Sequence, residues 1–217
     1  MMENFNRQEI KVPQAITETS KFDPDKRLEI NSDSRALKGE VEDSRAYGIE
    51  KASDVAKEMF PQDVLQEWKN MTEHHRKTYL EKYGDKIAEV LGINFKGVVF
   101  TERCDHMFCW GYTDGSGKVY VTPTLYKDPS KVIEAINTIS HEVRHEFQIQ
   151  AIRNPDKFHV DEKSYKEWKV AKETYSLVGA SELDPFGYEY NPLELDARHF
   201  GEGIISNLQR NLMEGVV

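Results

Sequence analysis

The chain has 217 residues and a formal net charge of −9, from 29 Lys and Arg against 38 Asp and Glu. This acidic balance argues against non-specific binding to nucleic acid or to an anionic membrane surface, and no apolar run approaches the roughly 20 residues of a membrane-spanning helix. The first residues lack the layout of a secretory signal, so we expect a soluble, cytoplasmic protein, with leaderless export left open.

Residues 1–55 differ in pattern from the rest of the chain. Their apolar residues are scattered singly, without a sustained period of 2 or 3.6, and charges of both signs alternate along them. This pattern is typical of a poorly ordered or peripheral arm. We therefore place the folded domain at residues 56–217, with a prosegment or partner-binding role as the alternative for the arm.

Two helices and a small β region are predicted next. Apolar residues at helical spacing predict one helix after Pro61 and a second that ends at Gly92, with an interruption considered at Gly84. Three apolar segments then indicate short strands, at residues 97–101, 108–112 and 118–122. The link between the last two strands is dense in Gly, Asp and Ser, so it predicts a hairpin.

Three further helices complete the predicted fold. The longest spans about residues 129–152 and presents one apolar face, and another spans residues 161–176. The last opens at Asn191, a capping residue that is followed by a proline, and runs to about Leu212. The fold class is therefore α+β, with helices packed on a small sheet.

The long helix contains the pattern His141-Glu142-Val143-Arg144-His145, an HExxH motif. Two histidines four residues apart differ by about 40° in angle and about 6 Å in rise, so both imidazoles can reach one ion. Zinc is the metal best matched to such ligands. Glu142 lies about 100° round the helix, where it can act as general base for a metal-activated water. The alternative is that both histidines only belong to a polar helix face.

A catalytic zinc site needs a third protein ligand. Glu194 in the last helix is the best candidate, because it shares a face with Ala197 and Gly201, whose small side chains allow close approach to another helix. The alternative is that Glu194 closes a reciprocal cap with Asn191. Asp196 is the second choice as ligand.

The motifs HEVRHEFQ and NPLELDARHFG together resemble the gluzincin type of zincin metallopeptidase. The resemblance is to a signature shared loosely by HtpX-like, CAAX-protease and compact ImmA/IrrE-like metallopeptidases, and it covers about residues 117–201. It implies a zincin-like fold with a small mixed sheet before the HExxH helix, peptidase activity and zinc binding by Glu194. Arg198 stands where that family has an Asp or Asn that orients a histidine, so another carboxylate or carbonyl must do so here.

The predicted function is zinc-dependent hydrolysis of a peptide bond in a peptide or protein substrate, aligned by an edge strand at residues 108–112 or 118–122. Tyr188 and Tyr190 precede the last helix and are candidates to stabilise the oxyanion, with Arg198 and Arg144 as weaker ones. Two alternatives remain: a metal-binding regulatory or interaction protein without catalysis, and a structural protein without metal.

Overall fold

A computed structural model of the chain describes residues 48–102, 110–158, 160–178 and 190–214. It is mostly helical with one small mixed sheet, as an α+β fold requires. After a first helix at residues 48–59, the elements are α2 (Gln62–Glu67), η1 (Trp68–Asn70), α3 (Glu73–Leu91), β1 (Val98–Phe100), β2 (Gly111–Thr113), β3 (Val119–Val121), α4 (Pro123–Lys127), η2 (Pro129–Lys131), α5 (Val132–Arg153), α6 (Pro155–Phe158), α7 (Glu162–Val178) and α9 (Pro192–Glu214). Within these residues, no helix has the length and apolar character needed to cross a membrane.

The sheet has the strand order β1-β3-β2. β1 pairs with β3 in parallel, and β2 pairs with β3 antiparallel, which confirms the predicted hairpin. β3 is therefore the central strand, and β2 is an edge strand. Of the predicted strand at 108–112, residues 108 and 109 lie outside the described residues, and β2 continues to Thr113.

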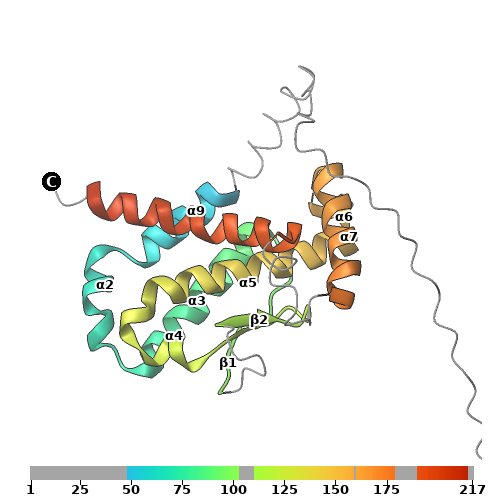
Figure 1. The fold of residues 1–217 in the computed structure, drawn as a ribbon. Helices are drawn as coiled ribbons and strands as arrows, with labels where there is room; N and C mark the ends of the chain where they lie inside the picture. The colour runs from blue at the N-terminus through green and yellow to red at the C-terminus, as the bar shows by residue number, and fades with distance from the viewer. Residues whose placement is uncertain (1–47, 103–109, 159, 179–189, 215–217) are drawn as a thin grey trace, which may run out of the picture.

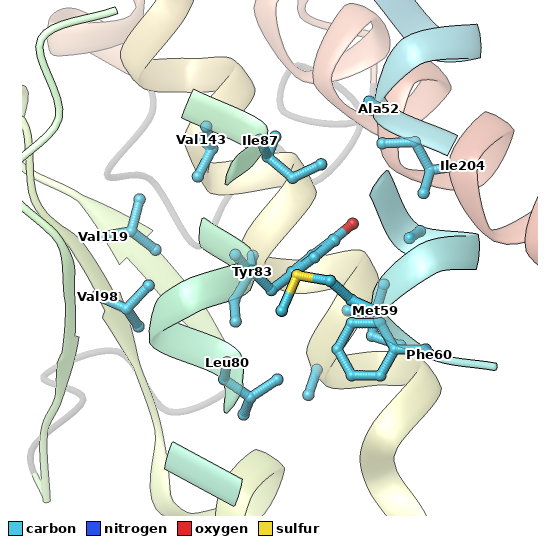
Figure 2. Close-up of a cluster of buried hydrophobic side chains, with 14 of the residues drawn as sticks. Ala52, Met59, Phe60, Leu80, Tyr83, Ile87, Val98, Val119, Val143 and Ile204 are labelled. Carbon is cyan, nitrogen blue, oxygen red and sulfur yellow. The ribbon is translucent and has the colours of Figure 1, made fainter. Parts of the chain in front are cut away.

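The hydrophobic core is shared by the sheet, the first helix, α3, α5 and α9. Tyr83 of α3 lies between Val98 and Val119 of the sheet on one side and, on the other, Met59 at the end of the first helix and Phe60 directly after it (Figure 2). All five side chains are at least 93% buried. Because Tyr and Phe bury large areas, this cluster contributes a substantial part of the hydrophobic stabilisation.

Two glycines mark α3. Gly92 has φ 65° and ends the helix in the left-handed conformation, as predicted. Gly84 does not interrupt the helix, contrary to the interruption considered from the sequence. Instead, a Cβ built at Gly84 would lie 2.7 Å from Cγ2 of Val98, so the missing side chain lets α3 pack directly on β1.

α5 is the central helix of the fold, against which the other elements pack. In Figure 1 it runs beneath α9 and above the sheet, and it contacts α9, α3 and β2. Its apolar stripe includes Ile136, Ile139 and Val143, which are fully buried as the periodicity predicted. The helix begins at Val132 and not at 129, because residues 129–131 form a separate turn of 3-10 helix.

The first helix begins inside the range assigned to the N-terminal arm. Ala52 and Ser53 are fully buried, and Asn207 Nδ2 of α9 donates a hydrogen bond of 3.0 Å to Ser53 Oγ. Residues 48–55 are therefore packed against α9, and the folded part starts before residue 56. The rest of the predicted arm, residues 1–47, lies outside the described residues.

Candidate metal centre

Three side chains predicted as metal ligands come together between α5 and α9. His141 Nε2 and His145 Nε2 are 3.0 Å apart. Glu194 directs Oε2 to 3.3 Å from His141 Nε2 and Oε1 to 3.3 Å from His145 Nε2. One ligand atom from each residue lies within 4.8 Å of the others, so the group could hold a metal ion.

The position of Glu194 follows from the local sequence of α9. Asn191 Oδ1 accepts a hydrogen bond of 2.9 Å from Leu193 N, which caps the helix start. Further along, a Cβ added at Gly201 would meet both the side chain and the backbone oxygen of Asn137 in α5. The missing side chain of Gly201 favours this close approach of the two helices, on whose contact Glu194 lies against the histidines.

Burial divides the site into a closed and an open side. The Glu194 side chain is 5% exposed, whereas the His141 and His145 rings are 19% and 14% exposed. The carboxylate thus forms the floor of the site, and the two rings border solvent.

The charges of the site are strongly coupled. Burial alone would raise the pKa of Glu194, but its hydrogen bonds to His141 and His145 outweigh that effect and lower the pKa well below the usual value. Burial alone would lower the pKa of His145, but the hydrogen bond to Glu194 and the charges of Glu142 and Glu194 raise it to about 9. The floor of the site is therefore anionic and attracts a cation, whether a proton or a metal ion.

Glu142 borders this group on the side of the sheet. It is 7% exposed, and burial raises the pKa of its carboxyl, while the neighbouring His145 and His141 partly oppose the rise. A Cβ built at Gly111 of β2 would lie 3.2 Å from Cγ of Glu142, so the edge strand passes directly beside this side chain. A carboxyl with a raised pKa is suited to proton transfer near neutral pH.

Asp196, the second choice as ligand, has a different partner. Arg144 Nε and Nη2 donate to its Oδ2 and Oδ1 at 2.8 and 3.1 Å. The guanidinium also lies over the rings of Phe147 and Phe200, with its carbon 4.6 and 5.1 Å from their centroids. The group that could hold a metal contains Glu194 and not Asp196.

The structure also shows a neighbour of His145 that the sequence reasoning missed. Gln148 Oε1 lies 2.8 Å from His145 Nδ1, and Gln148 Nε2 donates to Asp196 Oδ2 at 2.8 Å. Its position contained a signal, because residues 141, 145 and 148 fall on one stripe of a helix. The sequence could not show that α9 supplies the acceptors that hold the amide in place.

Within the described residues, the structure does not bring the candidates for oxyanion stabilisation together beside the histidines. Tyr188 lies outside them. Tyr190 is 67% exposed just before α9. Arg144 is engaged by Asp196, as described above, and Arg198 is half-buried on α9. The role of either tyrosine in stabilising an oxyanion stays a prediction.

Comparison with known proteins gives no relative. No protein-family model and no curated protein matches the sequence, and no solved structure matches the fold. The resemblance to zincins therefore stays a prediction that rests on the two motifs, and the functional argument rests on the geometry of the site.

Proposed function

We propose that this protein is a zinc-dependent metallopeptidase of the zincin type, which hydrolyses peptide bonds with Glu142 as general base. The observation that carries the proposal is the convergence of His141, His145 and Glu194 on one point, with Glu142 beside it. Two imidazoles and one carboxylate are a ligand set of catalytic zinc sites, in which a fourth position stays open for water or substrate.

The spacing of the donor atoms supports zinc. Ligands at about 2.0–2.1 Å from a tetrahedral ion are about 3.3–3.4 Å from one another. The two ring nitrogens are 3.0 Å apart, and each lies 3.3 Å from one oxygen of the Glu194 carboxylate, so these distances are close to such edges. The donor set is also the one that zinc prefers, whereas magnesium and calcium prefer oxygen ligands alone.

Each of these side chains has a separate role in the proposed reaction. His141 and His145 would hold a metal ion through Nε2, and Glu194 would hold it through its carboxylate and neutralise part of its charge. A zinc ion bound there supplies Lewis acidity, which lowers the pKa of water and polarises a carbonyl oxygen. The Glu142 carboxylate takes a proton from the attacking water and delivers it to the nitrogen of the leaving amine as the C–N bond breaks.

The edge strand offers a way to orient the substrate. Within the described residues, β2 pairs only with β3, so its other edge is open to strand addition by an extended peptide. Gly111 of β2 lies against Glu142, so a peptide aligned on this strand would bring its backbone near the general base. Trp110 directly precedes β2, and its indole is exposed, so it would offer an apolar contact close to this strand.

The substitution Glu142→Gln tests this function. The variant should bind zinc as tightly as the wild type, because Glu142 is not a ligand, and should cleave an unstructured peptide library about 10²–10⁴-fold more slowly. Glu146→Gln is the matched control: Glu146 is a buried glutamate one turn further along α5, hydrogen-bonded to Thr113, and its variant should retain cleavage. Equal cleavage by Glu142→Gln and the wild type would refute the mechanism. A zinc-loaded wild type without any cleavage would favour a non-catalytic metal-binding protein.

A further inference from the structure

The amide of Gln148 is fully buried and uses both of its ends in hydrogen bonds. Nε2 donates to the backbone oxygen of Leu193 at 2.9 Å and to Asp196 Oδ2 at 2.8 Å. Oε1 lies 2.8 Å from His145 Nδ1. One side chain of α5 therefore joins a histidine of the metal centre to the first turn of α9.

The orientation of this amide follows from its partners. A backbone carbonyl can only accept, and the Asp196 carboxylate accepts from Arg144 through both of its oxygens. The NH₂ end of Gln148 must therefore face α9, because the reverse orientation would set Oε1 against two acceptors. Oε1 then faces His145, and only an N–H on Nδ1 can complete that contact.

A proton on Nδ1 decides which nitrogen of His145 is available to a metal. In the neutral ring that carries its proton on Nδ1, the lone pair lies on Nε2. Nε2 is the atom that faces His141 and Glu194. The hydrogen bond that His145 Nδ1–H donates to Gln148 Oε1 thus selects the one tautomer of His145 that can bind an ion in this site.

We infer that Gln148 is a positioning residue that fixes the tautomer and the ring orientation of His145 for metal binding, held in turn by Asp196 and its ion pair with Arg144. The inference rests on the metal-binding part of the proposed function. It supplies the orienting group that Arg198 cannot provide, and it comes from an amide on the same helix as the ligand. Since Leu193, Glu194 and Asp196 all belong to α9, the same helix provides both a ligand and the support of another ligand.

The variant Gln148→Met tests the inference, because methionine has a similar volume and length and makes none of the three hydrogen bonds. Its zinc dissociation constant, measured in the full chain by competition with a chromophoric chelator, should rise about 10–100-fold. The matched control is Gln150→Met. Gln150 lies two residues further on α5, and within the described part of the chain its amide bonds only to the backbone of Asn94 at 2.9 Å. Its zinc affinity should stay within about twofold of the wild type, since it lies outside the polar network around His145.

A second measurement needs no variant and no activity. In the zinc-loaded wild type, long-range ¹H–¹⁵N spectra of the imidazoles should show the proton of His145 on Nδ1, protected from exchange with solvent. A proton on Nε2 would overturn the inference, as would a Gln148→Met variant that binds zinc as tightly as the wild type. The second of these results leaves the proposed function standing, whereas a proton on Nε2 also contradicts the proposed binding of zinc through that atom. A wild type that binds no zinc overturns the proposed function instead, so the two failures are distinguishable.

Discussion

Zinc binding to the wild-type chain is expected to strengthen steeply as the pH rises from neutrality. The pKa of His145 in the metal-free protein is raised to about 9, chiefly because Glu194 overcomes the effect of burial. An ion that binds Nε2 must first displace a proton from this ring. At pH 7 only about 1% of the rings are deprotonated, so the apparent affinity should lie about 100-fold below its limit and rise about tenfold per pH unit.

The assay is calorimetric titration of zinc into the full-length chain at several pH values. Repeating each titration in buffers of different ionisation enthalpy gives the number of protons released, which should be about one per ion at pH 7. Glu194→Gln provides the control: without the carboxylate, the pKa of His145 should fall, and the dependence above neutral pH should flatten while the affinity drops. A wild-type affinity that stays constant from pH 7 to 9, without proton release, would refute this coupling.

Three further predictions concern stability. In the metal-free chain, the raised pKa of His145 adds at most about 3 kcal/mol to the free energy of unfolding. This contribution is fully present below about pH 6.5 and is lost as the pH rises through about 9. Urea unfolding at pH 6 and pH 9 measures the difference. Asp196→Asn leaves the buried Arg144 without its anionic partner and should cost about 2–3 kcal/mol at pH 7 by the same method. Gly201→Ala forces a Cβ against Asn137 and should destabilise by about 1 kcal/mol net of the better helix propensity of alanine.

Each of these has a clear contrary result. Equal unfolding free energies of the metal-free chain at pH 6 and 9 would mean that the His145–Glu194 contact contributes nothing. An Asp196→Asn variant with the same free energy of unfolding as the wild type would mean that Arg144 finds another partner. A Gly201→Ala variant more stable than the wild type would mean that α9 and α5 do not approach as closely as the structure has them.

The candidate metal-binding group of His141, His145 and Glu194 was predictable, because helical periodicity determines which of these side chains share a face. Two histidines four apart on a helix must share a face, and the small residues Ala197 and Gly201 mark the face of α9 that can approach another backbone. The motif thus specified both the ligands and the contact that joins them. The shared face of the two histidines and the small residues of α9 both follow from residue spacing along one helix, which can be counted in the sequence.

Other features depend on how distant elements dock, and the sequence does not determine that by local rules. Gln148 is one of several polar residues on α5, and its role depends on Leu193 and Asp196 across the helix contact. The strand order that leaves β2 at the edge likewise follows from tertiary pairing. Residues 1–55 taken together show apolar residues scattered singly, which hides the helical spacing of Ile49, Ala52 and Val55 at their end.

The central claim is that one metal ion is held by His141, His145 and Glu194. Elemental analysis of the untagged full-length chain, after exposure to excess zinc and removal of free metal, tests it directly. The account predicts about one zinc per chain in the wild type and far less in the variants His141→Ala and Glu194→Ala. A wild type without zinc above background, or variants with the same zinc content as the wild type, would contradict it.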